Sequence, residues 1–111
     1  GALNIHAESS SDIKTRVIAA HNIQEERYLN IEGSVRYNSE ANVDIVNKWA
    51  AHDKGFSSLL PEIVKRFDLS ARAVSSLFKV ARTIADLENC SHVDPGHFME
   101  ALNYRVAFAY E

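Results

Sequence analysis

Apolar residues recur every three or four positions along most of the chain, a spacing typical of amphipathic helices. The clearest run covers residues 69–87, where the apolar positions are Ala73, Leu77, Val80, Ala81, Ile84 and Leu87. Ser70 precedes this run and is a good N-cap candidate, because its hydroxyl can accept a hydrogen bond from the first turn. The pattern therefore predicts one long helix that begins after Ser70 and ends near Asn89.

Shorter runs with the same spacing predict four more helices, at about residues 13–29, 43–51, 56–67 and 95–108. The last of these begins at Asp94-Pro95, an N-cap residue followed by a proline at the first helical position. Pro61 is expected within the first turn of the helix over residues 56–67. Because no stretch shows the alternation of a strand, the sequence predicts an all-α bundle of four to five helices.

Two features outside the predicted helical stripes need an interpretation. Residues 30–41 include Gly33, Asn38 and Ser39 and predict a loop. This loop is longer than most in compact domains, so we expect it to be mobile or to touch another domain. Trp49 stands beside the inner stripe of the second helix, and we expect it to pack in the core or between domains rather than to stack on a ligand.

The composition fits one small folded domain. The chain has 111 residues, of which 46% are hydrophobic, and its net charge is −3. This charge gives no general reason to expect nucleic-acid binding. The single cysteine, Cys90, excludes an internal disulfide, and no apolar run is as long as a membrane span. We therefore expect no membrane partner and a cytoplasmic location.

The first residues suggest how the domain is delimited. The chain begins Gly1-Ala2 rather than with methionine, so we expect it to be a piece of a longer protein. Residues 1–10 are assigned to a lead-in, and residues 11–108 to one helical domain.

Arg72 carries a charge that its position in the long helix disfavours. It falls in the first turn, where the helix macrodipole disfavours a cation by about 0.3–1 kcal/mol. A helix N-terminus with an arginine beside it is an arrangement that can bind a phosphate group. Ser76, Lys79 and Thr83 share this face by the three- and four-residue rule. The alternative is a solvated face on which Arg72 pairs with Asp68 or other acids.

The step between the third and fourth helices also fits a helix-turn-helix. Residues 70–79 would then be the recognition helix in the DNA major groove. Residues 62–82 carry five basic and two acidic side chains, which supports this alternative weakly. The apolar stripe that continues for two further turns and the acidic chain as a whole oppose it.

Metal and catalytic motifs are weak. Cys90, His92, Asp94 and His97 lie close together in sequence, but their spacing matches no standard zinc pattern. We interpret them as a polar turn that leads into a capped helix, and we predict no metal site. No catalytic triad, paired carboxylates or glycine-rich phosphate loop is recognisable. The chain by itself is therefore not expected to be an enzyme.

Two segments of the long helix resemble the C-terminal domain of magnesium-chelatase-related AAA+ ATPases, and most closely the competence-protein branch of the ComM type. They read Leu69-Ser-Ala-Arg-Ala and Val80-Ala-Arg-Thr-Ile-Ala-Asp-Leu87. Further matches follow in the family's order: Glu8-Ser-Ser, Arg16-Val17, Gln24-x-x-Arg27 and His97-Phe-Met-Glu-Ala-Leu-Asn-Tyr-Arg105. The resemblance extends over about residues 8–106, and the sequence departs from it mainly over residues 30–58.

This resemblance implies the helical lid of an AAA+ ATPase whose nucleotide-binding core lies outside the chain. Arg72 would occupy the sensor-2 position, an arginine that reaches the γ-phosphate of ATP. The resemblance therefore implies both a catalytic and a cofactor-binding role for Arg72. ATP and magnesium would be cofactors of the full-length protein, and none would bind this fragment alone. The matching residues Arg82 and Asp86 are expected to form a structural pair. Gln24 and Arg27 also match but have no assigned role, and interdomain packing is the simplest interpretation.

The same resemblance implies partners. They are the AAA+ core domain of the same protein, neighbouring subunits of a hexamer and, for the competence branch, DNA that the full-length protein would remodel by branch migration. The broader family implies an alternative function, which is the insertion of magnesium into a porphyrin.

Overall fold

The computed structural model describes residues 9–29 and 35–109, and it describes side chains only as far as residue 104. The elements follow in the order α2 (Ser10–Arg27), η1 (Asn38–Glu40), α3 (Val43–His52), α4 (Lys54–Phe67), α5 (Ala71–Leu87) and α6 (Pro95–Ala109). These residues form five α-helices, one 3₁₀ turn and no strand, so the predicted all-α fold is confirmed. Most of the predicted lead-in lies outside the described residues.

Each helix begins at a side-chain cap. The capping residues are Ser9, Asn42, Asp53, Ser70 and Asp94. The two predicted caps are confirmed, since Ser70 Oγ accepts from the Ala73 N–H at 3.1 Å and Asp94 Oδ1 accepts from the His97 N–H at 3.2 Å. Such a cap stabilises its helix by about 1 kcal/mol.

α4 begins two residues earlier than the sequence predicts. Asp53 alone separates it from α3, and the Asp53 carboxylate accepts a hydrogen bond from the Phe56 N–H at 3.2 Å. Pro61 consequently lies inside the helix, and its prediction for the first turn is wrong. The proline cannot donate to the Ser57 carbonyl, and its ring is exposed at the surface.

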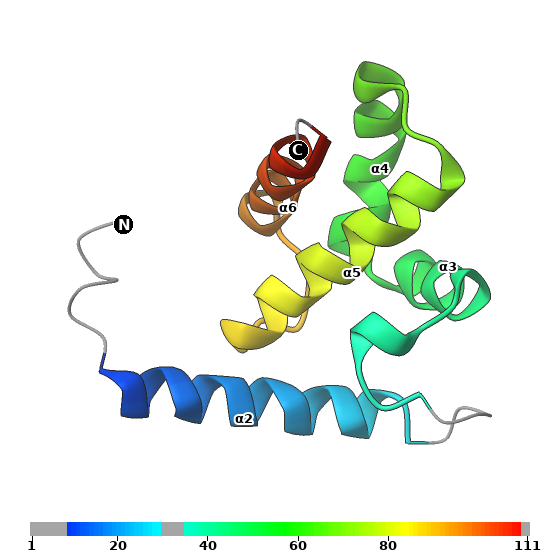
Figure 1. Cartoon of the computed structure of the whole chain (residues 1–111). Helices are drawn as coiled ribbons and strands as arrows, with labels where there is room; N and C mark the ends of the chain where they lie inside the picture. Colours follow the sequence, from blue (N-terminus) through cyan, green and yellow to red (C-terminus); the bar gives the residue numbers. More distant parts are fainter. Residues whose placement is uncertain (1–8, 30–34, 110–111) are drawn as a thin grey trace.

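α5 is the central helix of the bundle. It packs against α2, α3, α6 and η1, and Figure 1 shows it between α2 and α6. In the core, the Phe56 ring stacks on Phe98 and meets Phe78 edge-on, and both pairs of ring centroids are 4.9 Å apart. Ala81 and Ala85 of α5 are fully buried, which lets the neighbouring helices approach closely.

Glycine at position 55 allows one such close approach. A Cβ atom at this position would lie 2.0 Å from the Val93 carbonyl oxygen. The start of α4 therefore packs directly on the backbone that leads into α6. Trp49 is half-buried against the core and meets the Tyr28 ring edge-on with centroids 6.1 Å apart, which confirms its prediction as a packing residue.

The first half of α2 is exposed, although its helix was correctly predicted. Ile13, Val17 and Ile18 are 43%, 37% and 50% exposed, and only Ala20 and Gln24 of this helix are buried. Figure 1 shows these first turns extending beyond the end of α5. None of the described helices combines the length and apolar character that a membrane span needs.

The described part of the predicted loop is packed. Residues 35–41 include η1, in which Asn38 is 2% exposed, and Ala41 next to it is also 2% exposed. η1 packs against α5. Residues 35–41 are therefore part of the bundle and not the mobile connection that their polar composition predicts, while residues 30–34 lie outside the described part of the chain.

Candidate functional site

Arg72 is exposed at the start of α5. It is the second residue of the helix, and the first turn contains no acidic residue. Within residues 9–29 and 35–104, Arg72 has no hydrogen-bond or ion-pair partner, so the alternative pairing with Asp68 is not found there. The five N–H donors of its guanidinium therefore face solvent in the described part of the chain.

Arg72 lies at one end of a surface groove, which we call the α5–α6 groove. Two hollows of about 460 and 530 Å³ form it, and they share Ser76, Val80 and Tyr104. The other lining residues are Ser70, Arg72, Ala73, Leu77 and Ala101 in the first hollow, and Ser39, Lys79, Thr83 and Ile84 in the second. The groove therefore combines apolar walls with two cationic side chains from one face of α5.

A buried polar network occupies the C-terminal half of α5. Its centre is Asp86, whose side chain is 0% exposed. Arg27 of α2 binds Asp86 through two hydrogen bonds, Nη1–Oδ2 at 2.8 Å and Nη2–Oδ1 at 2.6 Å. Arg82 Nε and Asn38 Nδ2 also donate to this carboxylate, at 3.2 and 3.0 Å. One carboxylate thus connects α2, η1 and α5 through charge-assisted bonds.

Asn38 is a member of this network that the sequence analysis missed. Its Oδ1 accepts from Arg27 Nη1 at 3.0 Å and from the Tyr28 hydroxyl at 2.7 Å. Its backbone N–H donates to Gln24 Oε1 at 2.9 Å, and its Nδ2 donates to Thr83 Oγ1 at 3.1 Å. Asn38 lies in a polar segment without periodicity, so no sequence pattern distinguishes it from a solvated loop residue.

Arg82 extends the network to the connection between α5 and α6. Its Nη1 donates to Asp53 Oδ2 at 2.9 Å and to the Ser91 carbonyl at 3.0 Å, and its Nη2 donates to the Cys90 carbonyl. Asp53 in turn accepts from the Val93 N–H at 3.2 Å. Arg82 therefore fixes the backbone that joins the two helices.

Two members of the network, Arg27 and Tyr28, have raised pKa values. Burial alone would lower the pKa of Arg27, but the hydrogen bonds and charge of Asp86 outweigh it and raise this pKa. Burial also raises the pKa of Tyr28, and the nearby Arg27 only partly opposes this. Arg27 stays charged and Tyr28 stays neutral near neutral pH. Neither Arg27 nor Tyr28 is therefore expected to exchange a proton near neutral pH.

The four residues whose role the sequence left open all belong to this network. Gln24, Arg27, Arg82 and Asp86 each make at least one of its hydrogen bonds. Arg82 and Asp86 form the expected structural pair, whereas Gln24 and Arg27, for which interdomain packing is the simplest expectation, make these bonds inside the domain. Of the predicted polar face, Arg72, Ser76 and Lys79 line the α5–α6 groove, while Thr83 also reaches the network through Asn38.

The structure does not bring all four residues of the predicted polar turn, Cys90, His92, Asp94 and His97, to one point. Cys90 and His97 come together with Glu88, which the sequence analysis did not include. Asp94 caps α6 and lies against the other nitrogen of His97. His92 is exposed and lines a separate hollow with Trp49 and other residues. Only two of the four residues are therefore brought to one point.

The sequence matches one known family and several known proteins. A family model described as "Magnesium chelatase, subunit ChlI C-terminal" matches residues 7–105. The uncharacterized protein YifB of Salmonella typhimurium is 35% identical over 96% of the chain and 20% of its own length. The competence protein ComM of Haemophilus influenzae is 33% identical over 89% of the chain and 18% of its own length.

A third relative is the uncharacterized protein YifB of Escherichia coli, which is 30% identical over 92% of the chain and 19% of its own length. The chain thus spans about a fifth of the length of these relatives. No solved structure gives a significant match.

Proposed function

Because the chain belongs to the magnesium chelatase ChlI C-terminal family, we propose that it is the lid of an AAA+ ATPase and that Arg72 is the residue through which the lid acts on ATP. The observation that carries this proposal is the position of Arg72. It is exposed in the first turn of α5 and has no partner among the described residues. A cation at this position weakens the helix, and an anion bound beside it would remove that cost.

The surroundings of Arg72 fit half of a phosphate site. The first hollow of the α5–α6 groove is open beside it, and none of the described residues that line this hollow carries a carboxylate to repel a phosphate. The phosphate loop and the magnesium ligands would belong to the core domain that the family resemblance implies. When bound there, ATP supplies the phosphoryl group. The guanidinium fork of Arg72 would donate to the γ-phosphate oxygens and stabilise their charge.

The buried network supports this role indirectly. Asp86 and Arg82 hold the C-terminal half of α5 against α2, α4 and η1. A rigid helix fixes the direction in which the exposed arginine at its other end projects. Lid movement would then carry Arg72 toward or away from a phosphate as one unit with the bundle.

For the whole protein, we propose magnesium-dependent ATP hydrolysis by a cytoplasmic hexamer that remodels DNA. The support for DNA is that one relative is a competence protein. Metal insertion into a porphyrin is a second candidate, which the description of the matching family model favours. Arg72 would act on ATP in either case, whether in its own subunit or in a neighbouring one.

Burial within α5 disfavours the alternative of a helix-turn-helix module. Ser75, Leu77 and Phe78 lie inside the segment that would read DNA, and they are 5%, 2% and 3% exposed. Of residues 70–79, Ser70, Ala71, Arg72 and Ser76 are exposed, and Lys79 is half-buried. A recognition helix needs a broader exposed surface to enter the major groove.

The test is Arg72→Ala in the full-length protein. We expect kcat for ATP hydrolysis at saturating ATP to fall by about 100-fold or more, because one preorganised donor to the developing charge is lost. Arg66→Ala is the matched control, since Arg66 is an exposed arginine at the end of α4 that does not line the groove. Sedimentation should show an intact oligomer for both variants. Equal ATP hydrolysis by the two variants would refute the role of Arg72.

A scaffold role predicts a different pattern. If the domain only holds subunits together, Arg72→Ala leaves hydrolysis intact, whereas the core substitution Leu77→Ala disrupts assembly. ATP turnover by the 111-residue chain alone would contradict the assignment as a lid.

A further inference from the structure

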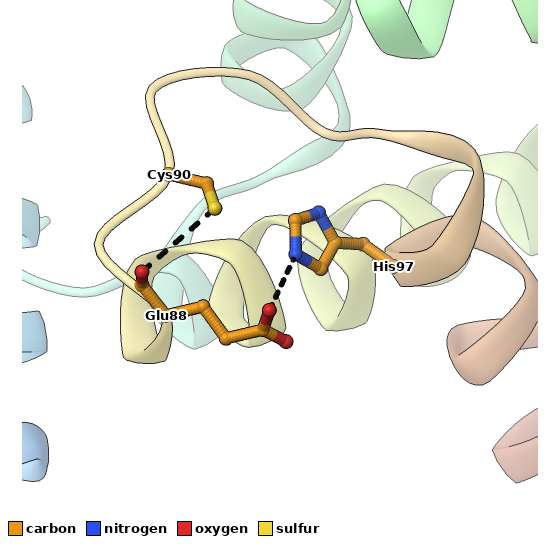
Figure 2. Close-up of side chains that lie close together, drawn as sticks. All are labelled: Glu88, Cys90 and His97. Atoms are coloured by element: carbon orange, nitrogen blue, oxygen red, sulfur yellow. Dashed lines mark hydrogen bonds and ion pairs between the residues drawn. The ribbon is translucent and has the colours of Figure 1, made fainter. Parts of the chain in front are cut away.

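The connection between α5 and α6 gathers three different metal-binding side chains. Glu88 lies at the end of α5, Cys90 in the connection and His97 in the first turn of α6, and Figure 2 shows their side chains converging. One ligand atom of each lies within 4.8 Å of the other two. A carboxylate, a thiol and an imidazole are thus within reach of one ion.

The separations are close to those in a tetrahedral zinc site. Zinc binds sulfur at about 2.3 Å and nitrogen or oxygen at about 2.0–2.2 Å, so two ligands of one ion lie about 3.3–3.8 Å apart. Glu88 Oε1 and His97 Nε2 are already 3.3 Å apart. The Glu88 side chain is 51% exposed, so it has room to rotate. Rotation of the Glu88 carboxylate and of the Cys90 thiol would bring the three ligand atoms to the separations of a zinc site.

We propose that Glu88, Cys90 and His97 bind a zinc-type divalent ion, with water in the fourth position. A ligand set of one soft thiolate, one imidazole and one carboxylate suits zinc and disfavours magnesium and calcium, which prefer oxygen alone. The site is distinct from the α5–α6 groove, and it does not depend on the proposed role of Arg72.

Two sets of hydrogen bonds fix the backbone around Cys90 before any ion binds. α5 ends in a Schellman motif, in which Asn89 has φ 56° and the Cys90 N–H donates to the Ala85 carbonyl at 2.8 Å. The Arg82 guanidinium also donates to the carbonyls of Cys90 and Ser91. Little conformational freedom of this loop would therefore be lost on binding.

Asp94 supplies a partner behind the histidine. Asp94 Oδ1 lies 3.3 Å from His97 Nδ1, on the side of the ring away from Glu88. A carboxylate that accepts from the far nitrogen of a metal-bound histidine is a recurrent arrangement in metal sites. In the metal-free arrangement the Asp94 N–H donates to Nδ1 at 3.1 Å.

Binding requires two proton movements and no redox partner. The Cys90 thiol, which donates to the Glu88 carbonyl at 3.8 Å, would release its proton to solvent and ligate as a thiolate. The ring proton of His97 would move from Nε2 to Nδ1, where Asp94 Oδ1 accepts it, and the hydrogen bond from the Asp94 N–H to Nδ1 would be given up. Nε2, which faces Glu88, is then free to bind the ion.

The experiment titrates the 111-residue chain with Co²⁺ and then displaces it with Zn²⁺. We expect one Co²⁺ per chain, a sulfur-to-cobalt charge-transfer band in the near ultraviolet, and loss of the band when Zn²⁺ is added. Zn²⁺ should also raise Tm by about 5 °C or more, because it binds only the folded chain. A chain that shows no such band with stoichiometric Co²⁺ would overturn the site.

Substitutions identify the ligands. Cys90→Ala should abolish the band and weaken Zn²⁺ binding at least 100-fold, and Glu88→Gln should weaken it at least tenfold. His92→Ala is the matched control, since this exposed histidine is close in sequence but lines a different hollow, and it should bind as the unsubstituted chain does. Equal Zn²⁺ affinity in Cys90→Ala and the unsubstituted chain would show adventitious binding and refute the proposal.

Discussion

Arg72 and Arg82 lie on the same helix, ten residues apart, and their surroundings differ in almost every respect. The Arg82 side chain is 5% exposed and donates to two carboxylates and two carbonyls. Arg72 is exposed and has no partner among the described residues. The two ends of α5 therefore differ in structure, since its C-terminal half holds the bundle together while its N-terminal end exposes a charge to solvent.

The energetics of the two regions differ as much as their geometry. Taking a charge out of water costs several kcal/mol unless partners and hydrogen bonds compensate it. The network around Asp86 meets this condition for each of its members, so every member depends on the others. Arg72 depends on no neighbour, and its charge weakens the helix by only about 0.3–1 kcal/mol. Substitutions in the two regions should therefore have opposite effects on folding.

The largest expected effect is that of Asp86→Ala. It removes four accepted hydrogen bonds and leaves Arg27 without its acidic partner, while Arg82 keeps only Asp53 as a counter-charge. We expect the free energy of unfolding to fall by about 3–5 kcal/mol. For a domain of ordinary stability this is a large part of the total. Urea unfolding followed by circular dichroism measures it.

Glu62→Ala is the control for this substitution. Glu62 is an exposed acid on α4, and its replacement should change stability by less than about 0.5 kcal/mol. If Asp86→Ala were no more destabilising than Glu62→Ala, the network would not be the structural centre that its hydrogen bonds indicate.

Tyr28→Phe tests the edge of the network through pH. Because the pKa of Tyr28 is raised in the folded state, its neutral form stabilises the fold below about pH 10, the usual tyrosine pKa. This contribution is lost as the pH rises through the folded pKa. At neutral pH, Tyr28→Phe should cost about 1 kcal/mol, since Asn38 Oδ1 loses one of its two donors.

The difference in free energy of unfolding between the unsubstituted chain and Tyr28→Phe should become smaller as the pH rises above about 10. Urea midpoints at a series of pH values would measure this difference. Both proteins should still lose some folding stability at alkaline pH, because the hydrogen bond to Glu25 raises the pKa of Tyr37. A gap that stays constant with pH would contradict the assigned role of the Tyr28 hydroxyl.

The sequence predicts helices well here because the caps and stripes are local signals. Ser70 and Asp94 begin their helices as expected, and the run to Leu87 is one helix. Packing partners are not local, which is why the burial of Asn38 and the exposure of Ile13 and Val17 were not foreseen. Pro61 was misplaced because Asp53 starts α4 early, and Asp53 is also fixed by Arg82 from a distant helix.

The two candidate sites also differ in how much of each the sequence can predict. The position of Arg72 follows from helix geometry alone, so the sequence was sufficient to place it at an exposed N-terminus. The cluster at Glu88 depends on the angle between two helices and on a Schellman turn at Asn89. Sequence spacing grouped His92 and Asp94 with Cys90 instead, because it cannot tell which side chains a turn brings together.

Arg72→Glu gives the smallest and most specific test of the comparison. It replaces a cation by an anion in the first turn of α5, and we expect the 111-residue chain to become more stable by about 0.5–1 kcal/mol at low salt. Arg66→Glu is the matched control, and it should lower the stability of the chain instead of raising it. Arg66 lies in the last turn of α4, where an anion is unfavourable. Urea midpoints at low and high salt should show both effects shrinking with ionic strength. A loss of stability in Arg72→Glu would mean that Arg72 contributes to the fold, and the case for a charge held for an outside anion would then fail.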